Sequence, residues 1–346
     1  MGINYEKLFD LLEYNEMSKI ELKDSANISY NVLAKLEKGE NISLDSLEKI
    51  CNVLNCNIEN VVSFDNDKPT LTPFVKWVGG KRQLYDEIKR RLPQKFNTYF
   101  EPFLGGGSVL FLINPKNAYI NDANEELINC YLQIKNNSTK LIYKLDELMD
   151  NHQKDPQNFY LKIRNLERLD DYQDLSDLDK AARFIYLNKT CFNGLYRVNS
   201  KGYFNVPWNK KEKVNLYDFN NIMNLSNYLN YNNIKINCGD FSEILKNVKK
   251  GDFVYIDPPY DLLNEATFDS YTKEAFGKEG QIRLAQICHE LNKKGCYFLL
   301  SNHNTELINE LYQDYHIDVV NAKRLINSNA KKRQKCEEVL IYNYEV

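Results

Sequence analysis

The chain has 346 residues, of which 43% are hydrophobic and 27% charged, and its formal net charge is −3 at pH 7. This composition is typical of a globular protein with a core of normal size, and the length suits two unequal domains. No apolar stretch approaches the roughly 20 residues that span a bilayer. The charged start, MGINYEKLFD, lacks the apolar region of a signal peptide. We therefore expect a cytoplasmic protein.

Cysteine and histidine are poorly placed for a metal site. The eight cysteines fall at irregular spacings without a C-x-x-C pair, and the four histidines are scattered. A structural zinc site needs close pairs of such ligands, so we expect no metal. Without a secretory signal the cysteines are predicted to be reduced thiols.

Residues 5–62 are predicted to form a compact all-helical unit. Apolar residues recur there at helical spacing. Gly39 would end the third helix as a left-handed cap, and Ser43 would begin the next. The segment that starts ISYNVLAKLEKGENIS at Ile28 resembles the phage-repressor (XRE-type) helix-turn-helix family. This resemblance implies a helix-turn-helix domain over residues 1–64.

The third helix of that domain would present Ser29, Tyr30, Asn31 and Lys35 to a DNA groove. However, residues 1–64 hold 6 Lys/Arg and 11 Asp/Glu, a net charge of −5, which opposes approach to phosphates. DNA binding therefore stands beside dimerisation or contact with the second domain as alternatives.

Residues 65–73 are polar and contain two prolines, which predicts a linker. Beyond the linker, the pattern of residues 74–125 predicts a helix, a strand, a glycine-rich turn, a helix and a strand. Residues from about 130 to 232 are predicted to be helical. Further elements are predicted as strands at 234–236, 252–256, 296–301, 316–320 and 337–343, and helices at 279–293 and 304–313. The pattern predicts one α/β sheet interrupted by a helical insertion.

The sharpest chemical motif is FVYIDPPY, residues 253–260. An apolar strand ends at Asp257, where open α/β sheets bind ligands. An adenine amine is a poor nucleophile because its lone pair is delocalised into the ring. Asp257 and the carbonyl of Pro258, whose φ is fixed, could accept its two hydrogens, and Tyr260 could stack on an extruded base. The alternative for this motif is a strand followed by a proline turn without a catalytic role.

A second motif is TYFEPFLGGGSVLF, residues 98–111, in which a strand runs into three glycines and a helix. Gly105 and Gly107 would let backbone amides approach a cofactor closely, although the spacing is not the dinucleotide pattern G-x-G-x-x-G. Asp122 ends the next strand, at a distance that suits a hydrogen bond to ribose hydroxyls. The alternative is that Asp122 is simply an exposed residue of a turn.

Two weaker motifs complete the set. FVKWVGGKRQL, residues 74–84, is compatible with an edge strand and a turn, with Trp77 in the core. NCGDF, residues 237–241, is a strand end at which Asp240 and Phe241 could hold the adenine of a cofactor. Plain core packing is the alternative for Phe241.

Together these four motifs resemble the Dam-like family of DNA adenine N6-methyltransferases, from about Phe74 to the C-terminus. The resemblance implies a Rossmann-like, S-adenosylmethionine-dependent methyltransferase domain over residues 74–346, acting on an adenine flipped out of duplex DNA. The implied catalytic motif is Asp257, Pro258, Pro259 and Tyr260. The residues implied to bind S-adenosylmethionine are Trp77, Gly79, Lys81, Glu101, Pro102, Phe103, Gly105, Gly107, Asp122, Asp240, Phe241 and Asp257.

The helical insertion would carry the target-recognition region, because residues 184–209 (FIYLNKTCFNGLYRVNSKGYFNVPWN) resemble that part of the family. An arginine such as Arg197 suits a bidentate contact to guanine, and equally a surface salt bridge. The basic stretch 323–340 matches a loop that would contact phosphates. The residues implied to contact DNA are Lys76, Phe192, Asn193, Leu195, Arg197, Pro207, Lys331, Lys332 and Arg333.

The family implies a GATC site or a longer site that contains GAT. Lys210 and Lys211 depart from the pattern, since relatives have another aromatic residue after the proline–aromatic pair, and this puts the mode of strand separation in doubt. Alternatives are a methyltransferase acting on RNA or cytosine, and a transcriptional regulator with a degenerate enzyme domain. Intact Asp257, Tyr260 and Gly105 speak against degeneracy. A companion restriction endonuclease and dimerisation through the first domain are further expectations.

Overall fold

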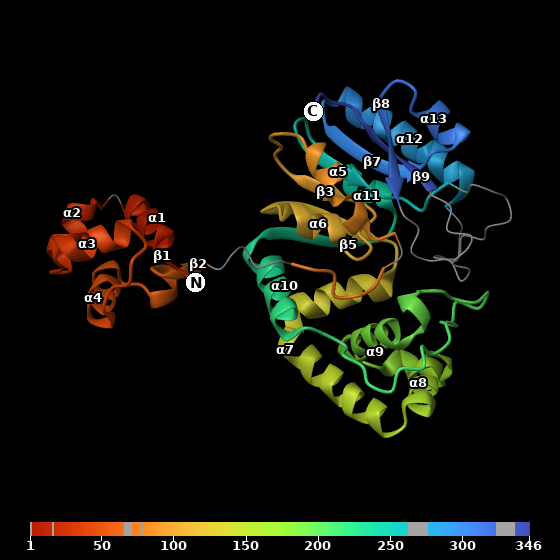
Figure 1. The fold of residues 1–346 in the computed structure, drawn as a ribbon, viewed down its shortest axis with the longest axis horizontal. Helices are drawn as coiled ribbons and strands as arrows, with labels where there is room; N and C mark the ends of the chain where they lie inside the picture. The colour runs from red at the N-terminus through yellow and green to blue at the C-terminus, as the bar shows by residue number, and fades with distance from the viewer. Residues whose placement is uncertain (1, 16, 66–70, 78, 262–275, 323–335) are drawn as a thin grey trace. The chain divides into compact units, whose positions relative to one another are not determined.

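The computed structural model describes residues 2–15, 17–65, 71–77, 79–261, 276–322 and 336–346. The chain divides into two compact units, Met1–Thr70 and Leu71–Val346 (Figure 1). The predicted fold class is confirmed: a small helical unit precedes an α/β unit with a mostly parallel sheet.

The first unit consists of short helices closed by a small β-ribbon. Its elements are β1 (Gly2–Asn4), α1 (Glu6–Tyr14), α2 (Lys19–Ser25), α3 (Tyr30–Glu37), α4 (Leu44–Leu54), η1 (Ile58–Asn60) and β2 (Ser63–Asp65). Ser18, Ser29 and Ser43 precede α2, α3 and α4, and each hydroxyl accepts a backbone N–H of the first turn. Such caps satisfy amides that have no partner inside the helix. The predicted start after Ser43 is confirmed.

The first unit contains one predicted feature, the left-handed Gly39, and one that was not predicted, the β1–β2 pair. Gly39 has a φ of +66°, the left-handed conformation predicted for the end of the third helix. Periodicity predicted helices only, yet β1 and β2 pair antiparallel, with Gly2 opposite Asp65. Three-residue strands are too short to show an alternating pattern, which explains why they were missed.

The second unit is built on a seven-stranded sheet with the order β5-β4-β3-β6-β7-β9-β8. The strands are β3 (Tyr99–Glu101), β4 (Asn117–Asp122), β5 (Asn233–Cys238), β6 (Phe253–Ile256), β7 (Tyr297–His303), β8 (His316–Ala322) and β9 (Cys336–Tyr342). The first five strands in the sheet order are parallel, and β9 is antiparallel to both of its neighbours. The chain moves outward from β3 to β5 and then returns to β6 beside β3. Open α/β sheets bind ligands at such a switch point.

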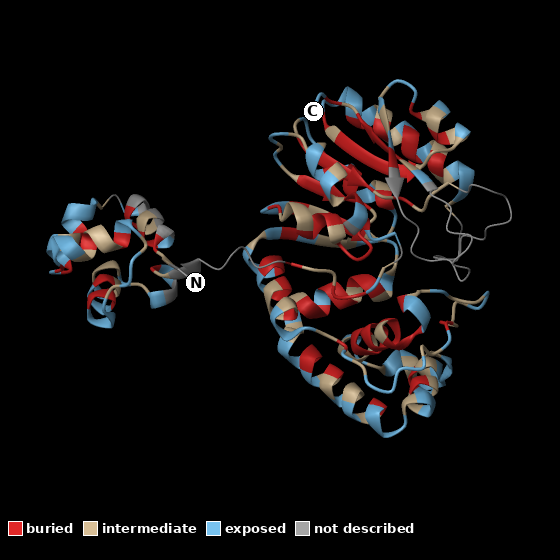
Figure 2. Ribbon diagram, viewed as in Figure 1, coloured by how far each residue is buried: buried red, intermediate tan, exposed pale blue. Residues whose placement is uncertain are grey.

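Helices pack on both faces of this sheet. The helices of this unit, of which α8 and α9 pack on α7, are α5 (Tyr85–Arg90), α6 (Ser108–Ile113), α7 (Glu125–Lys154), α8 (Pro156–Asn165), α9 (Asp177–Thr190), α10 (Phe219–Tyr231), α11 (Phe241–Leu245), α12 (Gly277–Lys293) and α13 (Glu306–Leu311). Alternate residues of β6 enter two core clusters, Phe253 and Tyr255 in one and Val254 and Ile256 in the other. Both faces of the strand are therefore buried, as Figure 2 shows for the centre of the sheet. A continuous apolar run is what a covered parallel strand requires.

The helical insertion follows β4 and forms a layer beside the sheet (Figure 1). It begins with α7, which bends at Asn137, where φ and ψ are not helical. Most of α9 is buried, including Arg183, which pairs with Glu126 and Glu167 at 3.2 and 3.0 Å. A buried guanidinium with two carboxylates avoids an uncompensated charge, so these pairs fix α9 against α7 and against the turn that follows α8.

One local prediction was wrong. Phe74 to Trp77 form no strand, although their apolar residues are compatible with an edge strand. Asn188 accounts for the difference, because its side-chain amide accepts from the N–H of Lys76 and donates to the C=O of Lys76, both at 2.8 Å. The backbone groups that a strand would pair are thus satisfied by a side chain.

Candidate active site and nucleic-acid interface

Two loops meet at the carboxyl ends of β3 and β6. We call residues 102–107 the cofactor loop and residues 257–261 the catalytic loop. The two strands are parallel neighbours, with Tyr99 opposite Phe253 and Phe100 opposite Val254. The loops that follow them therefore emerge side by side at the switch point of the sheet.

The cofactor loop requires its glycines. Gly105 has a φ of +50°, and a Cβ there would stand 2.6 Å from Cδ1 of Trp77. Gly107 has a φ of +70°, and a Cβ there would lie 2.7 Å from the hydroxyl of Tyr131. Tyr131 also donates a hydrogen bond to the carbonyl of Gly105 at 3.1 Å. A side chain at either glycine would displace the aromatic residues that shape the loop.

Asp122, predicted to bind ribose, already serves the cofactor loop. Its Oδ2 accepts from the N–H of Gly105 at 2.8 Å, and its Oδ1 accepts from the N–H of Asn124 at 2.9 Å. Each carboxylate oxygen has a second lone pair, so the group can accept a further hydrogen bond. Asp122 thus joins β4, the cofactor loop and the start of α7.

Glu101, predicted to bind the cofactor, points into the core. It is 2% exposed, and its Oε2 accepts from the hydroxyl of Tyr99 at 2.8 Å. Burial raises the pKa of Glu101 well above 4.5, and the charges of Asp257 and Asp122 act in the same direction. Pro102 is buried and Phe103 half-buried beside it. The structure thus brings Glu101 under the loop rather than to its open side.

The catalytic loop centres on Asp257. Its Oδ2 lies 2.7 Å from the ammonium nitrogen of Lys81, and its Oδ1 accepts from the hydroxyl of Ser301 at 2.9 Å. Lys81 is buried, donates to the carbonyl of Gly79 at 2.7 Å and lies 4.9 Å from the centre of the Tyr260 ring. The carboxylate is therefore held on both oxygens by fixed donors.

The remainder of the catalytic loop is braced by three polar side chains. Gln281 of α12 donates to the carbonyl of Pro259 at 2.8 Å, and Asn302 of β7 donates to Gln281 at 3.1 Å. The hydroxyl of Tyr260 donates to Glu338 at 2.8 Å. No described residue donates to the carbonyl of Pro258. That carbonyl keeps its acceptor capacity within the described part of the site.

Asp240 and Phe241 lie at the end of β5, one strand beyond the Asp122 strand. Arg283 binds both oxygens of Asp240, at 2.8 and 2.6 Å, and lies 4.7 Å from the centre of the Phe241 ring. The Arg283 hydrogen bonds lower the pKa of Asp240 to about 2. Phe241 is buried and stacks on Phe103 with ring centres 5.0 Å apart. This aromatic pair connects the β5 end with the cofactor loop.

The predicted target-recognition residues gather in one loop, residues 192–208, which we call the target loop. Phe192, Asn193, Arg197 and Pro207 are exposed there. The N–H of Phe192 donates to the carbonyl of Pro207 at 2.8 Å, which closes the loop. Leu195 is half-buried. Asn193 has a φ of +56°, a left-handed conformation that asparagine adopts more readily than most other residues with a side chain.

Lys76 is exposed and packs against the target loop, since a Cβ on Gly194 would lie 2.6 Å from the side chain of Lys76. Lys331, Lys332 and Arg333, predicted to contact phosphates, lie outside the described residues.

The sequence analysis gave no role to four residues that hold this site: Ser301, Gln281, Asn302 and Asn188. All four are buried polar side chains, at 0–3% exposure. Buried polar groups need partners, so each carries structural information. For Ser301 and Asn302 the signal in the sequence was a polar pair after the apolar run of β7, whereas Gln281 lies in a largely polar helix and becomes specific only when its burial is known.

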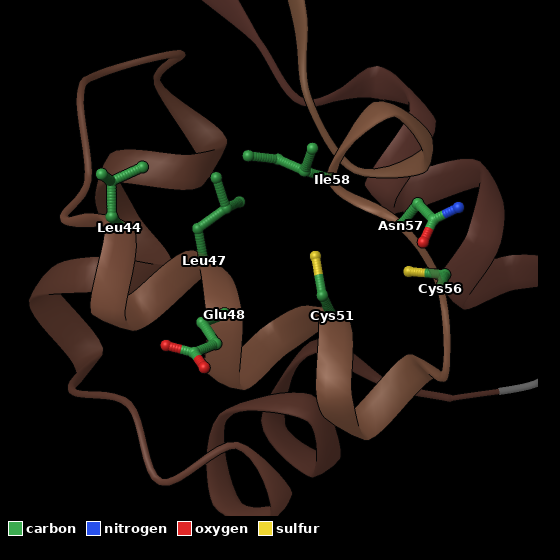
Figure 3. A pocket seen from close by; sticks show the side chains of 7 residues that line it. All are labelled: Leu44, Leu47, Glu48, Cys51, Cys56, Asn57 and Ile58. Atoms are coloured by element: carbon green, nitrogen blue, oxygen red, sulfur yellow. The ribbon is translucent and has the colours of Figure 1, made fainter.

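The first unit exposes Ser29, Tyr30 and Asn31 at the start of α3, as a DNA-reading helix requires. A separate hollow of about 350 Å³ lies between α4 and η1 (Figure 3). It is lined by Leu44, Leu47, Glu48, Cys51, Cys56, Asn57 and Ile58. Its mainly apolar lining is unsuited to phosphates, so it is distinct from the exposed start of α3.

Among the described residues, no three His, Cys, Asp or Glu side chains are grouped so that they could hold a metal ion. No described helix is long and apolar enough to cross a membrane.

Comparison with known proteins agrees with this geometry. The D12 class N6 adenine-specific DNA methyltransferase family matches residues 77–326, and the Cro/C1-type HTH DNA-binding domain matches residues 7–67. The chain is 44% identical over 280 residues to the Type II methyltransferase M1.LlaDCHI of Lactococcus lactis subsp. cremoris, covering 80% of this chain and 97% of that protein.

Two further relatives are more distant. The Type II methyltransferase M.MjaIII of Methanocaldococcus jannaschii is 41% identical over 292 residues, covering 79% of this chain and 99% of its own length. The DNA adenine methylase of Escherichia coli strain K12 is 34% identical over 273 residues, covering 77% and 93%. The chain therefore belongs to the D12 class of N6 adenine-specific DNA methyltransferases, and it carries a Cro/C1-type helix-turn-helix domain in its N-terminal part.

Proposed function

We propose that this enzyme transfers the methyl group of S-adenosylmethionine to the N6 amine of an adenine flipped out of duplex DNA, within GATC or a longer site that contains GAT. The observation that carries the proposal is the adjacency of the cofactor loop and Asp257 at the ends of neighbouring strands. Family membership favours adenine over the cytosine and RNA alternatives, and an enzyme over a degenerate regulator. The catalytic unit in this proposal is residues 74–346, preceded by a linker and the helix-turn-helix domain.

The residues at the switch point fit S-adenosylmethionine, which carries a sulfonium and an ammonium. The glycines of the cofactor loop form a cradle that a Cβ would fill. The Asp122 carboxylate lies beside this cradle, where it accepts from the N–H of Gly105 at 2.8 Å, and a carboxylate suits a cationic ligand. The proposed set is Trp77, Gly79, Lys81, Glu101, Pro102, Phe103, Gly105, Gly107, Asp122, Asp240, Phe241 and Asp257.

In the proposed mechanism Asp257 and the carbonyl of Pro258 accept the two amine hydrogens, which directs the nitrogen lone pair. When bound, S-adenosylmethionine supplies the electrophilic methyl group. Lys81 and Ser301 keep the carboxylate in place, and each carboxylate oxygen retains a lone pair for the amine. Methylation leaves the nitrogen with one proton in excess, and the Asp257 carboxylate is the base within reach. Tyr260 offers a stacking surface that offsets part of the few kcal/mol that base flipping costs.

Target reading is proposed for the exposed residues of the target loop together with Lys76. Arg197 supports this role, because its Nε donates to Asn205 at 2.7 Å and orients the guanidinium. Its two terminal nitrogens make no hydrogen bond with described residues, as bidentate recognition of guanine requires. Substitution of such a contact costs about 1–3 kcal/mol of discrimination. The specific site GATC rests on the resemblance of the target loop to the Dam-like pattern.

The setting of the enzyme is also a proposal. Two relatives are named Type II methyltransferases, which supports a companion restriction endonuclease acting on the same site. The exposed start of α3 supports DNA contact by the first unit, and dimerisation through this unit is the alternative. We place the enzyme in the cytoplasm, where its DNA substrate lies.

The test is transfer of tritiated methyl from S-adenosylmethionine to defined oligonucleotides, followed by nucleoside analysis. The proposal predicts N6-methyladenine in duplexes with GATC and none when the adenine is replaced. Methylcytosine as the sole product, or methylation of RNA alone, contradicts it.

A further inference from the structure

Trp77 lies between the cofactor loop and the target loop. Its indole edge packs on the backbone of Gly105, where a Cβ would stand 2.6 Å away. The same indole stacks on Tyr196, with ring centres 5.9 Å apart and an interplanar angle of 26°. Tyr196 stands between Leu195 and Arg197, both proposed to contact DNA. One aromatic pair therefore spans the two functional loops.

The Tyr196 ring is anchored at its far end. Its hydroxyl donates to Oε2 of Glu126 at 3.1 Å, near the start of α7. Burial and then the Glu126 carboxylate raise the pKa of Tyr196, so the hydroxyl keeps its proton and remains a donor. Glu126 itself accepts from the buried Arg183 at 3.2 Å. The ring cannot shift without disturbing this charged network.

The first turns of α7 provide a second route to the cofactor loop. Tyr131 on this helix donates to the carbonyl of Gly105 at 3.1 Å. Asn124, which caps the helix, donates its N–H to Asp122 at 2.9 Å. Tyr196 is therefore linked to the cofactor loop twice, by the Trp77 stack and by the helix that holds Glu126.

The backbone beside both rings is tied as well. Asn188 binds the N–H and C=O of Lys76, each at 2.8 Å, and donates to the carbonyl of Gly194 at 3.2 Å. Lys76 precedes Trp77, and Gly194 lies two residues before Tyr196. Asn188 is 3% exposed, so these bonds are shielded from water. One buried amide thus ties together the backbone segments that lead into the two aromatic residues.

We infer that Tyr196 is a positioning residue that couples DNA binding at the target loop to the shape of the cofactor loop. This inference rests on the proposed function. Packed interiors switch between discrete arrangements rather than deform continuously, so movement of the target loop reaches Trp77 through the stack. Coupling of this kind is reciprocal: DNA and the cofactor change each other's affinity by the same factor.

A binding cycle without turnover tests the link. Calorimetry measures the affinity for S-adenosylhomocysteine with and without an unmethylated duplex that carries the recognition motif. The proteins compared are the wild type, Tyr196→Phe and Tyr196→Leu. The wild type is expected to show a coupling factor of at least about fivefold. Tyr196→Leu removes ring and hydroxyl and is expected to bring the factor to about one, with the affinity for S-adenosylhomocysteine alone changed less than about twofold. Tyr196→Phe keeps the ring and is expected to retain most of the coupling.

Tyr203→Leu is the matched control, because Tyr203 is another aromatic residue of the target loop but packs on Arg168, 5.1 Å from its ring centre. It is expected to retain the wild-type coupling. An equal loss in this control overturns the inference, because general loosening of the loop would then explain the effect.

Fluorescence gives a second readout. The chain has two tryptophans, and Trp208→Phe leaves Trp77 as the sole indole. The Trp208 Nε1 is buried without a partner among the described residues, so its removal costs no hydrogen bond. Once this background is shown to bind the duplex, the duplex alone is expected to change Trp77 emission, and Tyr196→Leu to abolish that change.

Unchanged coupling in Tyr196→Leu overturns the inference, as does a wild type that binds both ligands independently. A wild type that binds neither ligand overturns the proposed function instead. If circular dichroism shows that Tyr196→Leu does not fold, the Trp208→Phe variant with Tyr196 intact decides, and a Trp77 emission that does not respond to the duplex is the contradicting result.

Discussion

The Lys81 ammonium lies 2.7 Å from the Asp257 carboxylate, and the two side chains are only 6% and 21% exposed. Sequence resemblance assigned Lys81 to the cofactor, whereas the structure pairs it with the proposed catalytic acid. Removing one partner of a buried ion pair leaves an uncompensated charge, which is costly. Lys81 therefore holds Asp257 in place and keeps a positive charge over the Tyr260 ring.

Lys81→Met is expected to lower the free energy of unfolding by about 3–5 kcal/mol, because Asp257, which is only 21% exposed, is then left without its counterion. Chemical denaturation measures the change. Lys144→Met is the control: Lys144 and Asp179 form a pair at 2.9 Å whose side chains are 42% and 35% exposed, and its loss should cost no more than about 1 kcal/mol. Equal losses in the two variants would show that burial does not matter for the Lys81 pair.

Gln281→Leu is expected to lower kcat while leaving the affinity for S-adenosylhomocysteine unchanged. The substitution removes the donor to the Pro259 carbonyl and the acceptor for Asn302, at a cost of about 1–3 kcal/mol in stability. Steady-state kinetics and calorimetry separate the two effects. Gln133→Leu on α7 is the control, since Gln133 is also buried but bonds only within its own helix. A normal kcat in Gln281→Leu would argue against its bracing role.

Glu101→Gln is expected to stabilise the protein near neutral pH. Burial raises the pKa of Glu101 above its unfolded value of 4.5, so the folded state favours the protonated form. The stability of this form is fully present below pH 4.5 and is lost as the pH rises towards the folded pKa. Glutamine does not titrate, so the advantage of the variant in melting temperature should grow above pH 4.5. A difference that is constant with pH contradicts a raised pKa.

Gly105→Ala is expected to weaken cofactor binding and to destabilise the fold, because a φ of +50° and the Trp77 ring both oppose a Cβ. Gly239→Ala provides the control: its φ is +132°, yet nothing lies within 4 Å of the added Cβ. Both variants carry backbone strain, of about 1–2 kcal/mol for a left-handed residue. Only Gly105→Ala should also lose affinity for S-adenosylhomocysteine, as calorimetry can measure. Equal affinities in the two variants would remove Gly105 from the cofactor cradle.

The local signals in the sequence predicted most elements of the fold. Gly39 ends the third helix at a positive φ, and the buried strand before Asp257 needs a continuous apolar run. The bounds predicted for the helix at 279–293 differ from α12 by two residues at one end only. These features depend on neighbours along the chain, which is why they could be predicted.

The contacts that make the site depend on residues far apart in the sequence. The residues of β3 do not by themselves indicate that this strand pairs with β6. The expectation that their loops form one site came from family resemblance. The Lys81–Asp257 pair, the Trp77–Tyr196 stack and the Asn188 bonds to Lys76 form only in the folded chain. The wrong prediction of an edge strand near Trp77 has the same cause. The side chain of Asn188, which is distant in the sequence, bonds to the backbone groups of Lys76 that a strand would pair.

Asp257 is the residue proposed to make an adenine amine reactive. Long-read sequencing of plasmid DNA from cells expressing the wild type or Asp257→Ala tests this role most directly, because it reports the modified base and its context together. We predict N6-methyladenine at one sequence motif in the wild type. In the variant we predict loss of this mark, with turnover in vitro reduced by about 10²–10⁴-fold and S-adenosylhomocysteine binding retained. Equal adenine methylation by Asp257→Ala, or a mark on cytosine, contradicts the account.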